Sequence, residues 1–452
     1  MTTPFETEVA RLMTEFNTPG LAVEMLARGR HHKAHVGRLA AGGSHPVTPQ
    51  TRFGTVCLIK TLIAIDILML AEKGEISLDA NIAEYLPELG NGPKAKGQFL
   101  KVRHLLSHTG GFRSFTPQRL LPKAHESWEN CVEMLHETEQ LFEPGTVFDD
   151  EHLGHIILGQ LIQRLKGKPF LDVIREEVLM PLGIRPGNRT EDAAQTEIYA
   201  FRHEWNREAK QWQAEPDSYL EPDPAFGAIS HLSMASADLL RLGEALLADA
   251  ADAGGPAISS WVKEKLFTEV VRVPRALNPM RITRWHVGGF GLGMGVFRGG
   301  HRGCVTTGRG QNSAIVFDRE RRSVVALAMN SANVLEREAL LNSLFANFAD
   351  DTSIVPEPKD LDIGFDEFLG PFTTRDIAGA YRGFRPEPVE IFATPRSFSL
   401  RLNGEEQYLF EASPKNRLMM RAKTSTSVGL FQDPVSRKPC LMMGMNAFKK
   451  VA

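Results

Sequence analysis

The chain has 452 residues, of which 42% are hydrophobic and 8% aromatic, and its formal net charge at pH 7 is −3. This length predicts two domains, and this composition is typical of globular proteins with large cores. The charge is close to neutral and forms neither a basic stripe nor a block of like residues. The sequence therefore argues against binding to nucleic acids or to membrane surfaces.

The N-terminal segment, residues 1–8, is polar and acidic and lacks the basic and apolar run of a secretory signal. The most apolar stretch, residues 62–70, contains Asp66 and is too short to span a bilayer. We therefore expect a cytoplasmic protein whose cysteines are reduced. The spacing of the four cysteines matches no zinc-binding pattern.

The first elements that we expect are a helix over residues 6–16 and two strands, at 21–26 and 31–39. Helical periodicity supports the helix, a Pro19-Gly20 break ends it, and strand-like patterning supports the two strands.

The middle of the chain, about residues 75–275, has the pattern of a helical region with long loops. Strand patterns return in four later runs, at 288–297, 300–303, 312–317 and 323–329. We expect these late strands to join the N-terminal pair in one antiparallel sheet, with helices packed on it and the helical region beside it.

A domain boundary is predicted at residues 350–371, which carry three prolines, several acidic residues and few hydrophobic ones. Six short alternating runs follow, at 389–393, 398–402, 407–410, 418–422, 429–432 and 440–443. Asn403-Gly404, directly after the second run, is a strong signal for a β-hairpin. We expect these runs to form a small antiparallel β-barrel, so that the domains are 1–355 and 370–452.

The most informative segment is residues 51–61, which opens a long apolar helix running to Lys73 and contains Cys57 and Lys60. Residues three apart face the same side of a helix, so the thiol and the ammonium are expected to lie together. A thiol near a helix N-terminus and a lysine has its pKa lowered from about 8.5 to roughly 3.5–7.5. Cys57 is therefore a candidate nucleophile, and a buried structural cysteine is the plain alternative.

Five pieces of sequence extend this motif in order along the chain: Cys57-Leu58-Ile59-Lys60, residues 72–79, the histidine-rich turn 102–111, Pro144-Gly145-Thr146 with Leu158-Gly159, and residues 180–184. In this order they resemble the serine β-lactamase and penicillin-binding-protein superfamily, in its class C β-lactamase and esterase branch, with cysteine in place of the nucleophilic serine. The resemblance covers roughly the first three quarters of the chain.

The C-terminal runs resemble the lipocalin-like domain of some penicillin-binding-protein-like esterases, D-aminopeptidases and peptide-cyclising thioesterases. The two resemblances together imply an α+β fold. A β-lactamase/transpeptidase-like antiparallel sheet flanked by helices, with a helical region, would be followed by a small antiparallel β-barrel domain.

In this superfamily a serine forms an acyl-enzyme, a lysine relays its proton, a Y-x-N tyrosine assists, and a K-T-G or H-x-G strand lines the site. We expect the strand element at residues 300–304, which read Gly-His-Arg-Gly-Cys. The resemblance then implies that the backbone N–H groups of Cys57 and Cys304 form the oxyanion hole. The substrate-binding residues would be Arg302, Gly303 and Arg309. For the two arginines, a solvated charged edge is the alternative.

The Y-x-N element is altered in this chain. Counting along the sequence places the tyrosine slot at Asp150 and the asparagine slot at His152, and none of the five tyrosines lies between Tyr85 and Tyr199. A thiolate can exist before attack, whereas an alkoxide must be generated during it. Loss of the tyrosine is therefore chemically consistent with gain of a cysteine.

The candidate catalytic residues are Cys57, Lys60, Asp150, His152 and His301. Lys60 and one histidine would hold Cys57 as the thiolate, with Asp150 orienting or tuning one of them. Which histidine is the base stays open at this point. Asp150 as a helix N-cap and His152 as a surface or capping residue are the plain alternatives.

The leading interpretation is an acyl-transfer enzyme that works through a Cys57 acyl thioester, as a hydrolase (esterase, thioesterase or amidase) or as an acyltransferase or cyclase. Its substrate would be a small-molecule or peptide ester, thioester or activated amide, including a carrier-protein-bound one, as in natural-product biosynthesis. We expect no metal and no other cofactor. The alternatives are a non-catalytic ligand- or partner-binding protein and an enzyme that forms or cleaves carbon–carbon bonds with the same cysteine.

Overall fold

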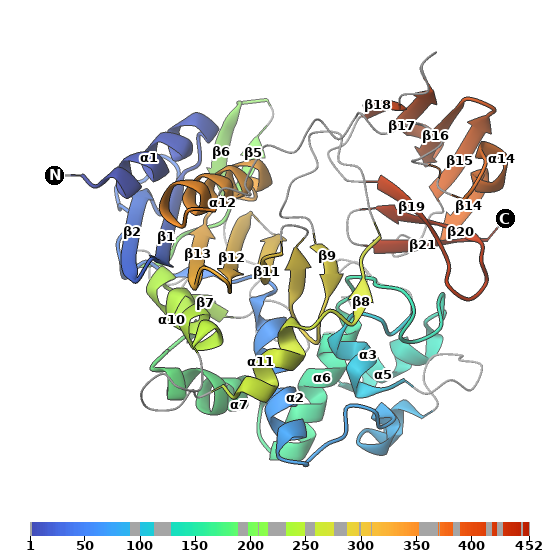
Figure 1. Cartoon of the computed structure of the whole chain (residues 1–452), viewed down its shortest axis with the longest axis horizontal. Helices are drawn as coiled ribbons and strands as arrows, with labels where there is room; N and C mark the ends of the chain where they lie inside the picture. The colour runs from blue at the N-terminus through green and yellow to red at the C-terminus, as the bar shows by residue number, and fades with distance from the viewer. Residues whose placement is uncertain are drawn as a thin grey trace. The chain divides into compact units, whose positions relative to one another are not determined.

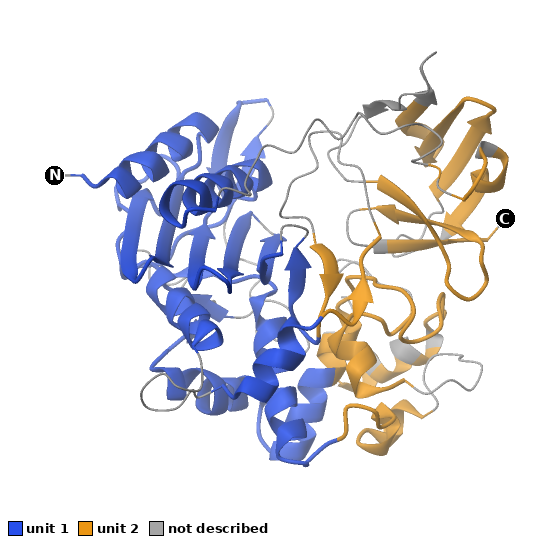
Figure 2. Ribbon diagram, viewed as in Figure 1, with its two compact units in different colours: residues 1–76, 158–268, 292–355 blue, residues 77–157, 269–291, 356–452 orange. Residues whose placement is uncertain are grey.

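The computed structural model describes residues 2–90, 100–112, 128–188, 198–206, 208–215, 232–248, 258–274, 287–297, 300–308, 310–351, 369, 371–382, 389–412, 418–422, 428–443 and 446–451. The chain forms two compact units (Figure 2). Unit 1 comprises residues 1–76, 158–268 and 292–355, and unit 2 comprises residues 77–157, 269–291 and 356–452.

Most of the predicted boundary segment, 350–371, lies outside the described residues. Unit 1 ends at Val355, as the predicted first domain does, but unit 2 also takes in residues 77–157 and 269–291. The division of the chain into domains 1–355 and 370–452 stays a prediction.

The core of unit 1 is an antiparallel sheet in which strands from the two ends of the unit pair (Figure 1). Within unit 1 its strand order is β2-β1-β13-β12-β11-β10. Their bounds are β1 Gly20–Ala27, β2 Arg30–Gly37, β10 Gly295–Phe297, β11 Arg302–Gly308, β12 Gln311–Asp318 and β13 Ser323–Met329. The register sets Leu21 opposite Met329, which confirms that the N-terminal hairpin joins the late strands.

Helices cover both faces of this sheet (Figure 1). The helices of unit 1 are α1 Pro4–Phe16, α2 Leu58–Glu72, α7 Phe170–Val173, α10 Ser236–Leu247, α11 Ser260–Phe267 and α12 Val334–Phe348, with a π-helical turn η3 Ile174–Leu179 and a 3-10 turn η4 Met180–Leu182. α1 starts at a capping box between Thr3 and Glu6 and has a proline in its first turn. It packs with α12 on one face, whereas α10 packs on the other face of β1, β12 and β13.

Short strands complete unit 1. A three-stranded sheet has the order β3-β7-β4, and β5 pairs with β6. Their bounds are β3 Phe53–Gly54, β4 Gly187–Asn188, β5 His203–Asn206, β6 Gln211–Ala214 and β7 Leu232–Met234.

The late strands differ in extent from those predicted. The sequence predicts one strand over 288–297, but β9 (Val287–Phe290) ends before Gly293 and β10 begins after it. Gly293 has a φ of 111°, and a Cβ there would lie 2.2 Å from the Ala64 Cβ, so only glycine fits this position. In the other direction, β11 continues to Gly308, beyond the predicted end at Gly303.

Helix α2 passes through the interior and is apolar on all its sides. Its residues 58–68 and Leu70 are buried, which is typical of a central helix rather than an amphipathic surface one. Lys60 and Asp66 are its buried charged exceptions, and Asp66 has 1% of its surface exposed and neither carboxylate oxygen hydrogen-bonded among the described residues. Burial raises the pKa of Asp66 to about 6 from an ordinary value of 3.8, and Glu177 adds to the rise.

We expect Asp66→Asn to stabilise the protein at pH 7. The folded pKa of Asp66 lies above the unfolded one, so the ionisation of Asp66 opposes folding increasingly between pH 3.8 and about 6, and in full above pH about 6. The shift corresponds to at most about 3 kcal/mol in the free energy of unfolding. Urea unfolding of the wild type and of Asp66→Asn at pH 7.5 and pH 4 measures this difference in the free energy of unfolding. An equal gain at both pH values would contradict the assignment to ionisation.

Unit 2 contains a curled antiparallel sheet with the strand order β18-β17-β16-β15-β14-β21-β20-β19. The strands are β14 Gly379–Arg382, β15 Val389–Thr394, β16 Ser397–Leu402, β17 Glu405–Ala412, β18 Leu418–Ala422, β19 Val428–Gln432, β20 Pro439–Met443 and β21 Asn446–Lys450. The predicted hairpin at Asn403-Gly404 joins β16 to β17, with φ values of 52° and 78° that suit a tight primed turn. In the described residues the sheet is a half-barrel that ends at β18 and β19.

The rest of unit 2 is mainly helical, and one longer helix, α6, crosses into unit 1. The helices are α3 Val102–Leu106, α5 Trp128–Glu137, α6 Leu153–Lys166 and α14 Thr374–Ile377, with 3-10 turns η1 Ile82–Glu84 and η2 Pro87–Leu89. β8 (Val271–Arg272) pairs antiparallel with β9. The predicted α+β fold class is thus confirmed. In the described part of the chain, no helix has both the length and the apolar character needed to cross a bilayer.

Candidate active site

Cys57 stands at the N-terminus of α2, as the sequence predicts. It is the residue before the first helical turn, it is half-buried, and its thiol is not in a disulfide. The Lys60 N–H donates to the Cys57 carbonyl at 3.0 Å, and 6% of the Lys60 surface is exposed. A half-buried thiol therefore lies at the positive end of the helix dipole, one turn from a buried ammonium group.

The residue before Cys57 has a strained backbone. Val56 has a φ of 48°, a left-handed conformation that is a genuine outlier for a β-branched residue. Such a conformation costs about 1–3 kcal/mol and persists only where its surroundings impose it. Here Thr55 is fixed from two sides: its N–H donates to the Leu232 carbonyl at 3.0 Å, and the Ser313 hydroxyl donates to the Thr55 carbonyl at 2.9 Å.

Strand β11 lies against this turn with its C-terminal half. The Thr306 Oγ1 is 2.7 Å from the Ser313 Oγ and 3.4 Å from the Thr55 carbonyl oxygen. A Cβ at Gly308 would lie 3.3 Å from the Val56 Cγ1, which is tighter than an ordinary contact. The residues beside the Cys57 turn are therefore Thr306-Thr307-Gly308.

Sequence reasoning missed this segment because it selected the H-x-G match at His301. At about 3.3 Å per strand residue, Thr306 lies roughly 16 Å further along the chain. The available signal was Thr306-Thr307-Gly308 itself, which differs from K-T-G only in its first residue. Cys304 lies between the two segments, half-buried and opposite Ile315 of β12.

His301 belongs to a buried charge network at the start of β11. Its Nε2 is 3.2 Å from the Asp351 carboxylate and 4.0 Å from that of Asp318. Arg321 pairs with Asp318 at 2.7 Å and lies 3.7 Å from Asp351. These contacts favour a structural role for His301 beside the two carboxylates, and its role as the catalytic base stays a prediction.

The predicted substrate-binding residues lie beside this network. The Arg302 guanidinium donates to the backbone carbonyls of Phe267 at 3.0 Å and Gly300 at 2.6 Å, so it fixes the turn before β11. A Cβ at Gly303 would lie 2.2 Å from the Ile315 carbonyl oxygen, which explains the glycine there by strand packing. Arg309 lies outside the described residues.

Asp150 and His152 lie in unit 2, where the chain enters α6. The His152 carbonyl accepts the first helical hydrogen bonds, from the His155 N–H at 3.1 Å and the Ile156 N–H at 3.2 Å. The Glu151 carboxylate caps the same helix by accepting the Gly154 N–H at 2.6 Å. Asp150 is 36% exposed, and its Oδ1 is 3.7 Å from the His108 Nε2.

Comparisons with known proteins identify the family. The family model described as Beta-lactamase matches residues 5–347, so the chain belongs to the beta-lactamase family. Penicillin-binding protein 4 of Amycolatopsis lactamdurans is 28% identical over 174 residues, which cover 38% of this chain and 45% of that protein. Esterase EstB of Burkholderia gladioli is 26% identical over 160 residues, which cover 31% of this chain and 39% of that esterase. The chain thus matches less than half the length of each of these relatives.

Solved structures confirm the fold over the whole chain. SurE has a TM-score of 0.77 at 19% identity, covering 99% of this chain and 98% of that one, and SurE with D-Leu has a TM-score of 0.72 at 19% identity over the same shares. EstCE1, described as a hydrolase with promiscuous acyltransferase activity, has a TM-score of 0.59 at 18% identity, covering 75% and 98%. The predicted membership of the superfamily is confirmed, whereas the replacement of its serine by Cys57 stays a prediction.

Proposed function

We propose that this protein is an acyl-transfer enzyme whose nucleophile is the Cys57 sulfur. The observation that carries the proposal is the turn at the start of α2. A half-buried thiol follows a strained valine and precedes a buried lysine by one helical turn. Strain held in place by surrounding hydrogen bonds clusters at functional sites, and a thiol near an ammonium group and a helix N-terminus is activated as a thiolate.

In the proposed reaction the Cys57 thiolate attacks the carbonyl carbon of an ester, a thioester or an activated amide. A C–S bond forms, the bond to the leaving group breaks, and the leaving group takes up a proton. Water then releases the acid, or an amine or another nucleophile takes the acyl group and gives a transferase or cyclase product. In either case the Cys57 side chain is regenerated as the free thiolate.

The oxyanion of the intermediate needs N–H donors. The Cys57 N–H at the start of α2 is one proposed donor. The sequence analysis proposes the Cys304 N–H as the second, and the contacts of the Thr306–Gly308 segment with the Val56 turn support a donor from that end of β11 instead. From the sequence alone, we also propose that Asp150, in the tyrosine slot, and His152 assist the Cys57 nucleophile.

For the substrate we propose a peptide acyl donor, activated as an ester or as a carrier-bound thioester. One observation supports a peptide: SurE, whose fold matches nearly the whole chain at a TM-score of 0.77, has a second structure described as SurE with D-Leu, an amino acid. Exchange between two thioesters is nearly balanced in free energy, so a cysteine nucleophile suits a thioester donor. The corresponding setting is natural-product biosynthesis in the cytoplasm.

Intact mass spectrometry after incubation with peptide thioesters and p-nitrophenyl esters tests the proposal. We expect one acyl adduct on the wild-type protein and none on Cys57→Ala. Cys440→Ala is the matched control, because Cys440 is buried, burial raises the pKa of its thiol to about 12, and its removal should leave the adduct unchanged.

Three results would go against this assignment. No adduct with any donor would favour the non-catalytic binding protein. An adduct that persists on Cys57→Ala would place the nucleophile elsewhere. An acyl adduct whose acyl group is released as the product of a carbon–carbon condensation or cleavage would favour an enzyme that forms or cleaves carbon–carbon bonds with the same cysteine.

A further inference from the structure

Unit 2 contains a buried cluster of two imidazoles and a carboxylate that the proposed chemistry does not use. Glu151 precedes α6, which begins at Leu153, and His155 lies in the first turn of this helix. His108 follows α3, and its carbonyl accepts the Asp149 N–H at 2.9 Å. This backbone hydrogen bond brings two segments more than forty residues apart in sequence into contact.

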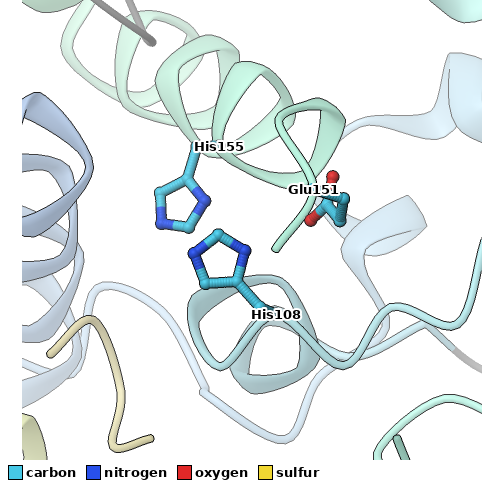
Figure 3. Close-up of side chains that lie close together, drawn as sticks. All are labelled: His108, Glu151 and His155. Carbon is cyan, nitrogen blue, oxygen red and sulfur yellow. The ribbon is translucent and has the colours of Figure 1, made fainter. Parts of the chain in front are cut away.

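The three side chains are almost fully enclosed. Their exposed fractions are 3% for His108, 1% for Glu151 and 0% for His155. One nitrogen or oxygen atom from each lies within 4.8 Å of the other two. The imidazole rings face each other with centroids 4.6 Å apart, and Glu151 approaches from one side (Figure 3).

We propose that His108, Glu151 and His155 bind a divalent cation, with zinc as the best match. Two imidazoles and one carboxylate form a known three-ligand zinc set, with bonds of about 2.0–2.2 Å and a fourth position for water. Tetrahedral coordination at these lengths sets donor atoms roughly 3.4 Å apart, so the cluster would contract by small side-chain rotations.

The surroundings of the cluster also suit a metal. Metal-bound histidines commonly donate their second N–H to a carboxylate. The Asp150 Oδ1 lies 3.7 Å from the His108 Nε2, so it can take this role while the His108 Nδ1 binds the metal. The Phe148 and Phe290 rings pack edge-on against the His108 ring, with centroid distances of 5.7 and 5.2 Å, and form an apolar wall.

A second cluster has a similar inventory but does not support the same proposal. His301, Asp318 and Asp351 also bring three potential ligand atoms within 4.8 Å. There the Arg321 guanidinium pairs with Asp318 at 2.7 Å and lies 3.7 Å from Asp351, so a cation already balances the carboxylates. Only the His108 cluster is therefore proposed as a metal site.

This proposal departs from the sequence-based expectation that the protein binds no metal. That expectation rested on cysteine spacing, whereas these ligands come from segments that only the fold brings together. The bound ion would fasten the start of α6 to the loop after α3, at the position where the family tyrosine is replaced. The metal-site proposal does not depend on the assignment of Cys57 as the nucleophile.

Zinc binding by the full-length protein tests the proposal. After incubation with ZnCl2 and desalting, we expect one zinc per chain by elemental analysis and a higher melting temperature that EDTA reverses. Glu151→Gln keeps an oxygen to accept the Gly154 N–H but removes the charge, and His155→Phe keeps a ring. In competition with a chelating indicator, each should weaken zinc binding by at least about tenfold.

His136→Ala is the matched control, because His136 is an exposed histidine of α5 in the same unit, and it should bind zinc like the wild type. Zinc bound at well below one equivalent, or an affinity that Glu151→Gln leaves unchanged, would overturn the proposal. If the variants do not fold, the Co2+ spectrum of the wild-type protein decides. Visible bands without a thiolate charge-transfer band support the site, and a charge-transfer band would assign the metal to a cysteine and overturn it.

Discussion

Cys57→Ala is expected to lower the turnover of an acyl thioester by about three orders of magnitude or more, with the fold intact. Removing a covalent nucleophile removes the acyl-enzyme route and leaves only the contribution of binding and oxyanion donors. Cys57 is half-buried, so the smaller alanine creates no large cavity. Steady-state kinetics with a peptidyl thioester measures the loss, and thermal unfolding checks the fold.

Cys57→Ser is the informative partner of this variant. A serine hydroxyl must lose its proton during attack, and the tyrosine that assists this in the family is missing from the slot at Asp150. We therefore expect the turnover of Cys57→Ser to lie between that of the wild type and that of Cys57→Ala. Turnover of Cys57→Ala within tenfold of the wild type would contradict the proposed function.

Lys60→Met is expected to move the pH dependence of Cys57 alkylation to higher pH. The buried ammonium favours the thiolate, so its removal should raise the thiol pKa to about 8.5 or above. At pH 7 a thiol with that pKa is only about 3% thiolate, and turnover should fall by roughly thirtyfold. The rate of iodoacetamide reaction between pH 5 and 10 gives the midpoint.

Lys73→Met is the control, since Lys73 is an exposed residue at the other end of α2. It should leave the midpoint where it is in the wild type. A midpoint that stays the same in Lys60→Met would show that Lys60 does not activate the thiol. Methionine has a similar length and suits a buried position, so a loss of folding is not the expected cause of any change.

The sequence predicted the architecture well where patterns are local. The strand-like runs at residues 21–26 and 323–329 predicted strands, and the register of Leu21 with Met329 confirms that they share one sheet. Asn403-Gly404 predicted a hairpin because few residues accept two consecutive positive φ values. Likewise, the one-turn spacing of Cys57 and Lys60 follows directly from helix geometry.

Tertiary contacts decided the parts that local patterns did not reveal. Residues 300–308 contain both an H-x-G match and the near match Thr306-Thr307-Gly308, and the sequence pattern does not decide between them. The hydroxyls of Thr306 and Ser313 decide it through their contacts with the Thr55 carbonyl. The same holds for His108 and His155, whose proximity depends on the packing of α6 against the loop after α3. Residue chemistry was readable from the sequence, whereas strand position and long-range neighbours were not.

The left-handed valine before Cys57 has a consequence for attempts to improve this protein in the laboratory. Glycine or asparagine at position 56 would relax the backbone and favour the folded state. The same change would make the backbone before Cys57 more flexible, and with it the position of the sulfur. Screens for heat tolerance and screens for catalytic speed would therefore drive position 56 toward different residues, and libraries built for new substrates are best directed away from Thr55, Val56 and Cys57.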